Sequence, residues 1–171
     1  MIDIILQGTF YNPTKGQMSL QEVLQELILY LKEKPEREYE IIIGCDSSSV
    51  EEPTFPVVIV VLRKKEGGRF FLTKVRYPAP RKFYNIHDRI LQEVLLSCEL
   101  ASWLRENFSI AAKKENLQVS YQLQYIHADV GENGVTKDMI KEVTGLILGN
   151  GFKPMIKPKS FAASSVADRF A

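Results

Sequence analysis

Apolar and polar positions along the first half of the chain predict one amphipathic helix followed by three strands. Ser19 and Glu22 have the spacing of a capping box, and the apolar positions that follow recur at helical spacing until Pro35. Three later runs are rich in β-branched and aromatic residues, which favours strands. They cover residues 39–46, 57–62 and 70–77, and Glu66-Gly67-Gly68 supplies the turn between the last two.

The second half alternates between the helical period and the strand period. We expect, in order, a long helix over about 86–107, a strand over 118–129, a helix capped by Thr136, a short strand over 153–157 and a terminal helix capped by Ser160. After the N-terminal helix, the predicted order is therefore β-β-β-α-β-α-β-α. A three-stranded meander followed by alternating helices and strands predicts an α/β domain. It would have a mixed five-stranded sheet flanked by helices, with an extra N-terminal helix.

Length and composition favour a single domain with a short additional arm. A chain of 171 residues fits one domain, so we interpret residues 1–18 as a loosely attached N-terminal arm and residues 19–171 as the domain. Apolar runs stay below the ~18 residues of a membrane span, and residues 1–7 lack the basic lead-in of a signal peptide. Cys45 and Cys98 lie in apolar segments, which favours buried free thiols over a disulfide. These observations predict a cytoplasmic protein without membrane contact.

The net charge of +1 conceals an uneven distribution along the chain. Residues 1–52 carry 4 basic and 10 acidic side chains, whereas residues 53–90 carry 9 basic and 2 acidic ones, a net charge of +7. A basic segment of this kind is typical of a surface that faces a polyanion, although a solvated hairpin rich in Lys and Arg has the same composition. The predicted N-terminal helix is compatible with a dimer, and the oligomeric state stays open.

Two aspartates stand at the carboxyl ends of predicted strands. Asp46 ends the strand predicted over 39–46, and Asp129 ends the strand predicted over 118–129. Ligand chemistry in α/β sheets gathers at the carboxyl ends of strands, so both positions favour a functional site. Taken alone, each is more often an aspartate that closes the following turn.

Glu93 lies on the apolar face of the long predicted helix. At 100° per residue, Ile86 and Val94 bound an apolar sector of roughly 80°, with Leu100 beyond the Ile86 edge, and Glu93 falls between Leu100 and Ile86. A carboxylate on a buried face is unfavourable unless a cation or an arginine compensates its charge. A bound metal ion would do so, and Arg89 one turn earlier is the alternative partner.

Asp168 in the predicted terminal helix completes a set of four acids from four separate elements, although a near-terminal aspartate is by itself typical of a solvated surface. Hard divalent cations such as Mg²⁺ or Mn²⁺ prefer carboxylate oxygens and keep several waters. Two such ions ~3.5–4 Å apart activate water on one side of a phosphorus and stabilise the leaving oxygen on the other. Asp46, Glu93, Asp129 and Asp168 are therefore the candidate metal ligands and catalytic residues. No Cys or His cluster in the sequence competes as a softer site.

The chain from about residue 10 to residue 170 resembles the YkuK-like family, a bacterial group of predicted ribonuclease H-like nucleases. The motifs that carry the resemblance are IGCDS at 43–47, HADVGENGVTK at 127–137, KP at 157–158 and SVADR at 165–169. The resemblance implies a ribonuclease H-like fold. The wider superfamily places metal-binding acids on the first strand, the first long helix, the fourth strand and the last helix. Asp46, Glu93, Asp129 and Asp168 match these places one by one, which implies hydrolysis assisted by two metal ions.

The sequence departs from typical ribonucleases H in two respects. No histidine occurs between Gly134 and Asp168, where those enzymes carry one that assists product release. The basic, tryptophan-rich insertion that binds substrate in some members is also missing. The resemblance therefore does not imply efficient cleavage of RNA–DNA hybrids.

Five further polar residues are predicted to contact a substrate. Ser47 and Ser48 are placed to donate to phosphate oxygens, His127 shares a strand face with the second aspartate, Lys137 starts a predicted helix, and Lys159 follows the last strand. The alternatives are serines that close a turn, a structural histidine and lysines on an exposed face.

These observations favour a metal-dependent nuclease that cleaves phosphodiester bonds in RNA or DNA with Mg²⁺ or Mn²⁺. The alternative is a non-catalytic module that binds nucleic acid or protein and retains the fold. ATP-dependent phosphotransfer is disfavoured because it needs two copies of this fold, and because the sequence has no G-x-x-x-x-G-K-[ST] motif. The sequence does not distinguish RNA, DNA and hybrid substrates, or internal from terminal cleavage.

Overall fold

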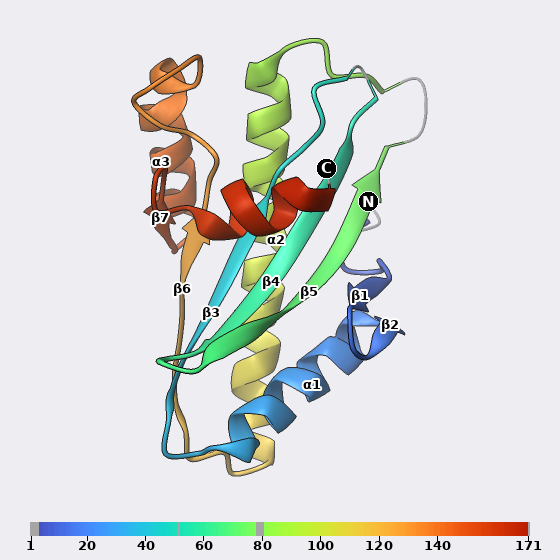
Figure 1. The fold of residues 1–171 in the computed structure, drawn as a ribbon, viewed down its shortest axis with the longest axis vertical. Helices are drawn as coiled ribbons and strands as arrows, with labels where there is room; N and C mark the ends of the chain where they lie inside the picture. Colours follow the sequence, from blue (N-terminus) through green and yellow to red (C-terminus); the bar gives the residue numbers. More distant parts are fainter. Residues whose placement is uncertain (1–3, 51, 78–80, 171) are drawn as a thin grey trace.

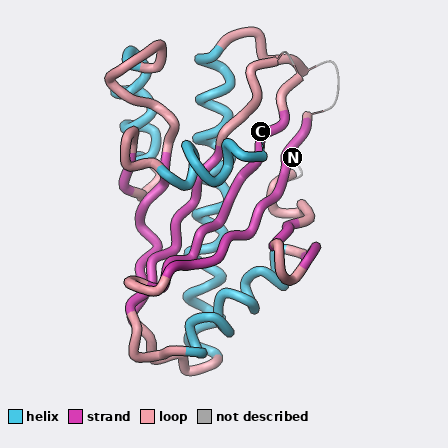
Figure 2. Tube along the Cα trace, in the orientation of Figure 1, coloured by secondary structure: helices cyan, strands magenta, loops and turns pink. Residues whose placement is uncertain are grey.

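The computed structural model describes residues 4–50, 52–77 and 81–170, and within them a sheet of seven strands is flanked by helices (Figure 1; Figure 2). The strands are β1 (Phe10–Asn12), β2 (Gly16–Met18), β3 (Glu38–Cys45), β4 (Thr54–Arg63), β5 (Gly67–Arg76), β6 (Ser120–His127) and β7 (Lys153–Met155). The α-helices are α1 (Leu20–Glu33), α2 (Ile86–Lys114) and α3 (Ile140–Gly149). The terminal helical segment consists of a π-helical turn over Ala162–Val166 and a 3₁₀ turn over Ala167–Phe170.

The sheet is mixed and has the strand order β2-β1-β5-β4-β3-β6-β7. β3, β4 and β5 form an antiparallel meander, and Gly67 adopts a φ of 95° where the chain enters β5. β6 pairs parallel to β3, and β7 pairs parallel to β6. Parallel strands need long crossovers, which α2 and α3 supply. The carboxyl ends of β3, β6 and β7 therefore meet at one end of the sheet.

The strand count differs from the predicted five because residues 10–18, expected within a loose arm, form a hairpin. β1 pairs with β2, and it joins the meander through the pairing of Tyr11 with Leu72. Asn12 Nδ2 also donates to Phe70 O at 3.0 Å. Strands of three residues are too short to show a period-two pattern, so the sequence carried no strand signal here.

Three helices also differ from their predicted form. α2 continues to Lys114 rather than ending near residue 107, because its apolar stripe extends to the buried Phe108 and Ala112. Thr136 occupies the N-cap position of a 3₁₀ turn over Lys137–Met139 that leads directly into α3, but its side chain makes no capping hydrogen bond. Its Oγ1 instead accepts a hydrogen bond from Gly131 N. The predicted terminal helix forms as a combination of π and 3₁₀ turns.

The two faces of the sheet are covered differently. α1 and α2 pack on one face and enclose the larger core, whereas the terminal helical segment crosses the other face over β3 and β4 (Figure 1). Successive strand residues point to opposite faces, so Ile41 and Ile43 face the helices while Ile42 and Gly44 face the terminal segment. No helix in the described part of the chain is both long and apolar enough to pass through a bilayer.

Candidate functional site

A cleft of about 370 Å³ lies where the carboxyl ends of β3 and β6 approach the terminal helical segment. It is lined by all four acids that the sequence predicted: Asp46, Glu93, Asp129 and Asp168. Asp46 directly follows β3, and Asp129 comes two residues after β6. Glu93 comes from α2 and Asp168 from the terminal helical segment. Four elements that are distant in sequence thus each place one carboxyl group in the same cleft.

Asp46 and Asp168 interact directly in this cleft. Their side chains are joined by a hydrogen bond, and Asp46 is 8% exposed. Burial raises the pKa of Asp46 from 3.8 to about 7, the hydrogen bond to Asp168 adds to the rise, and the N–H of Ser47, which donates to Asp46 Oδ1 at 2.9 Å, opposes it. Protonation of Asp46 relieves the repulsion between these neighbouring carboxyl groups. A cation at this place would relieve the same repulsion.

Glu93 is 4% exposed, as its position on the apolar stripe of α2 predicted. Glu93 Oε2 accepts a hydrogen bond from Ser47 Oγ at 2.6 Å. Burial raises the pKa of Glu93 well above its usual value, and the hydrogen bond from Ser47 acts in the opposite direction. Arg89, the alternative partner considered from the sequence, donates to Ser47 O, Ser47 Oγ and Ser48 O at 3.2–3.5 Å. Arg89 therefore holds the loop that follows Asp46.

Asp129 has two partners that the sequence did not identify. Ser164 Oγ donates to Asp129 Oδ1 at 2.9 Å, and Lys157 Nζ lies 3.1 Å from the same oxygen. Lys157 reaches this place because β7 runs parallel to β6, and Lys157 N donates to Val130 O at 2.9 Å. Gly131 makes room for the lysine, since a Cβ at Gly131 would lie 2.9 Å from Lys157 Cβ. Predicting this ion pair would have required the register between β6 and β7, which the local sequence pattern does not give.

Of the five predicted substrate contacts, the structure brings Ser47 into the cleft, whereas the other four are not among the described residues that line it. Ser48 is half-buried beside the cleft, and Lys137 and Lys159 are exposed. Their contact with a substrate stays a prediction. The loop with Asn133 and Thr136 also lines the cleft, and it lies inside the motif at 127–137, which was the available signal.

His127 connects β6 to the terminal helical segment. It is 3% exposed, and its Nδ1 accepts a hydrogen bond from Ala162 N at 3.1 Å. Its ring meets the ring of Phe161 edge-on, with centroids 4.7 Å apart. Burial lowers the pKa of His127 to about 4, so the imidazole is neutral at pH 7 and able to accept this bond. The histidine therefore helps to place the segment that carries Asp168.

The donor set suits a hard cation that keeps most of its waters. Within residues 4–50, 52–77 and 81–170, no three or more His, Cys, Asp or Glu side chains are gathered closely enough to enclose a metal ion. Mg²⁺ commonly binds through one or two carboxylates and retains water, whereas an all-protein cage is typical of other ions. The hydrogen-bonded pair of Asp46 and Asp168 in a mainly polar cleft matches the first type of site.

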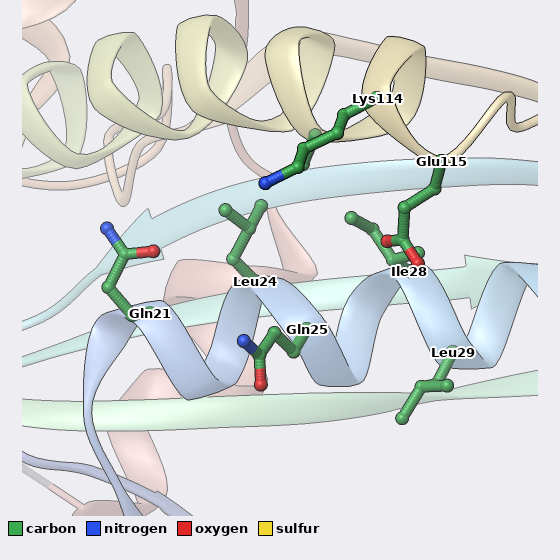
Figure 3. Close-up of a pocket in the computed structure, with 8 residues that line it drawn as sticks. Gln21, Leu24, Gln25, Ile28, Leu29, Lys114 and Glu115 are labelled. Atoms are coloured by element: carbon green, nitrogen blue, oxygen red, sulfur yellow. The ribbon is translucent and has the colours of Figure 1, made fainter.

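A second hollow is a poor candidate for phosphate chemistry. It lies between α1 and the end of α2 and measures about 530 Å³ (Figure 3). Leu24 and Ile28 of α1 point toward α2, and Lys114 and Glu115 approach from the opposite side (Figure 3). Glu115 is paired with Lys32 at 2.8 Å. The described lining of this hollow includes none of the predicted site residues.

Comparisons with known proteins agree with the architecture. A family model described as "Ribonuclease H-like" matches residues 22–171. The uncharacterized protein YkuK of Bacillus subtilis (strain 168) is 28% identical over 168 residues, which cover 94% of this chain and 95% of YkuK. No solved structure matches the chain. The family model spans most of the chain and the mixed α/β sheet fits its fold, so the protein belongs to the YkuK-like, ribonuclease H-like family.

Proposed function

We propose that the protein is a nuclease that hydrolyses phosphodiester bonds in RNA or DNA with the help of Mg²⁺ or Mn²⁺. The observation that carries this proposal is the convergence of four carboxyl groups from separate elements on one cleft. Two of the four, Asp46 and Glu93, are buried, and buried carboxyl groups are rare without compensation. The ribonuclease H-like family is consistent with a nuclease, while the relative YkuK is itself uncharacterized.

The residues of the cleft have distinct parts in this proposal. Asp46 and Asp168 would hold a cation between them, with Asp129 as a further ligand, and bound cations would activate a water and stabilise the leaving oxygen. Glu93 is fixed by Ser47 Oγ and would contribute negative charge from the α2 side. Lys157 lines the cleft as a cation and is placed to attract a phosphate. The cleft thus offers carboxylates for metal and a cation for substrate.

The alternative, a binding module without catalysis, is supported by a specific observation. Lys157 pairs with Asp129, and the described acids do not form a group of three or more that could surround a metal ion. A chain in which the lysine had replaced a metal ion would keep the fold and the phosphate affinity while lacking hydrolysis. The two proposals differ in their response to divalent cations.

Cleavage assays distinguish these functions. Labelled single-stranded RNA, single-stranded DNA, duplex DNA and an RNA–DNA hybrid are incubated with the protein in Mg²⁺, Mn²⁺ or EDTA. We expect cation-dependent products, and a loss on the order of 100-fold or more in Asp46→Asn and Asp129→Asn, because even the outer partners of metal ligands are worth 10–100-fold. Asp138→Asn removes the same charge at an exposed position and serves as the control. Cleavage at the parent rate by both cleft variants would refute the nuclease, and intact substrate with salt-sensitive binding would favour the module.

A further inference from the structure

A basic groove runs along β5, separate from the acidic cleft. The β5 groove measures about 640 Å³, and its lining includes Tyr11, Leu72, Lys74, Arg76 and Phe170. Lys74 and Arg76 are the charged residues among its described lining, so the groove is cationic where the cleft is rich in acids. Lys74 and Arg76 belong to the segment 53–90, which carries a net charge of +7.

The groove lies on the face of the sheet that carries the terminal helical segment. Leu72 packs in the small core beneath that segment, and Lys74 and Arg76, two and four residues further along β5, point to the same face. Tyr11 is the cross-strand partner of Leu72 and therefore also faces this side. Phe170 lines the groove, and its ring lies 5.8 Å from that of Phe70 on β5.

The sheet places this groove close to the acids. Asp46 N donates to Pro56 O at 3.3 Å, and Pro56 is the register partner of Lys74 on β5. Asp46, Pro56 and Lys74 therefore form one row across three neighbouring strands. With strands about 4.8 Å apart, the backbones of Asp46 and Lys74 are roughly 10 Å apart. Asp168 lines the cleft while Phe170, two residues later, lines the groove, so the two hollows adjoin.

The side chains of the groove combine cations with accessible aromatic rings. Lys74 Nζ lies 6.0 Å from the centroid of the Phe170 ring, and Arg76 Nε donates to Oγ1 of Thr54, its partner on β4, at 3.3 Å. Tyr11 is 41% exposed. Grooves that bind single strands without strong sequence preference combine positive charge for the backbone with aromatic rings on which bases stack. A duplex offers its phosphates but not the faces of its bases.

We infer that the β5 groove binds the single-stranded part of a nucleic acid that continues beyond the cleft, with Lys74 and Arg76 on its phosphates and Tyr11 and Phe170 against its bases. The inference deepens the proposed function and rests on it, because it places the cleaved bond over Asp46 and the adjoining nucleotides along β5. Binding in the groove is nevertheless measurable without cleavage.

The test measures binding of the full chain in EDTA, where hydrolysis is suppressed. Fluorescence anisotropy follows a labelled oligothymidylate of about 20 nucleotides, longer than the ~4–16 nucleotides that such sites occupy, over a range of salt. Lys74→Gln with Arg76→Gln removes two positive charges from the groove. Lys113→Gln with Lys114→Gln removes two from the far end of α2 and is the matched control. Thermal unfolding verifies that each variant is folded.

The expected results follow from counterion release. Each phosphate contact contributes about 0.7 to the slope of log affinity against log salt for a single strand, so the groove variant should lose about 1.4 from that slope. Its affinity defect at about 0.1 M salt should then be about 25 times that at 1 M. Tyr11→Leu should weaken binding about five-fold or more at every salt concentration, because a stacked base is lost. The control variant should keep the slope of the parent.

Several outcomes would overturn the inference. A groove variant with the affinity and slope of the control, a parent that does not bind the oligothymidylate at low salt, or a duplex of equal length that depends on Lys74 and Arg76 to the same degree would each do so. Failure of the proposed function has a different signature. In that case the parent binds the strand through the groove but yields no products with Mg²⁺ or Mn²⁺.

Discussion

Gly44 in the middle of β3 is the position at which the terminal helical segment lies closest to the sheet. A Cβ at Gly44 would lie 2.7 Å from Ala163 N, 2.8 Å from Ala162 C and 2.9 Å from Ala162 Cβ. Real Cβ atoms essentially never approach closer than 3.0 Å and ordinary contact begins at 3.4 Å, so the segment must move by about 0.3–0.7 Å to admit one methyl group. Because the nearest atoms are backbone, no change of rotamer relieves the clash.

We expect Gly44→Ala to lower the free energy of unfolding by about 1–3 kcal/mol, which is the usual effect of overpacking a buried site. The gain in backbone entropy from replacing glycine, roughly 0.5–1 kcal/mol, offsets part of the strain. The displaced segment carries Asp168, so its hydrogen bond with Asp46 should be lost as well. Cation-dependent cleavage should therefore fall in this variant even at temperatures where it is fully folded.

Urea unfolding followed by circular dichroism measures the stability change. Gly145→Ala in α3 is the matched control, since a Cβ at Gly145 meets nothing within 4 Å. Alanine is the better helix former, so this control should gain up to about 1 kcal/mol. A Gly44→Ala protein as stable as the parent would show that the segment does not pack against β3 as described.

Three further predictions concern Asp46, His127 and Lys157. In EDTA, Asp46→Asn should raise the free energy of unfolding more at pH 8 than at pH 5, because a carboxyl with a folded pKa of about 7 against 3.8 loses stability as pH rises through that range. The two gains should differ by at most about 3 kcal/mol, since roughly two pH units of the shift lie between pH 5 and pH 7. Urea titrations at both pH values, with Asp138→Asn for comparison, check this, and equal gains would contradict it. His127→Leu should lower stability at pH 7 by about 1–3 kcal/mol, because Ala162 N–H loses its acceptor. His127 has a pKa of about 4 in the folded parent against 6.5 in the unfolded chain, so the parent should lose stability as pH falls from about 6.5 to about 4. His127→Leu should lack this contribution to the acid sensitivity in urea titrations over the same pH range. Lys157→Gln should tighten Mn²⁺ binding a few-fold in calorimetry, since the partly exposed lysine competes for Asp129; weaker binding would indicate that the lysine supports the site.

Local pattern was sufficient to predict the elements and the faces that carry the acids. The capping box of Ser19 and Glu22 forms as predicted, with each side chain accepting from the backbone N–H of the other residue. Glu93 could be assigned to the buried face of α2 because the helical repeat determines its direction relative to the apolar residues around it. Asp46 and Asp129 could be placed at strand ends because the apolar run that predicts a buried strand also shows where that strand stops.

The remaining features depend on groups that are far apart in sequence. The hairpin β1–β2 joins the sheet through Tyr11 and Leu72, and Lys157 pairs with Asp129. Local periodicity predicts neither contact, because each depends on how strands and loops that are distant in sequence are aligned in the sheet. The same holds for Gly44: the sequence shows a glycine within a strand, and the packing of the terminal helical segment supplies the reason.

The sequence by itself determined that four carboxyl groups are available and on which elements they lie. The tertiary structure decided that Asp46 lies against Asp168, that a lysine pairs with Asp129, and that the backbone of Lys74 in the cationic groove lies roughly 10 Å from that of Asp46. The physical reason is that periodicity orients a side chain relative to its own helix or strand. Its distance from other side chains is set by strand order, register and the close approach of segments, which are properties of the whole sheet.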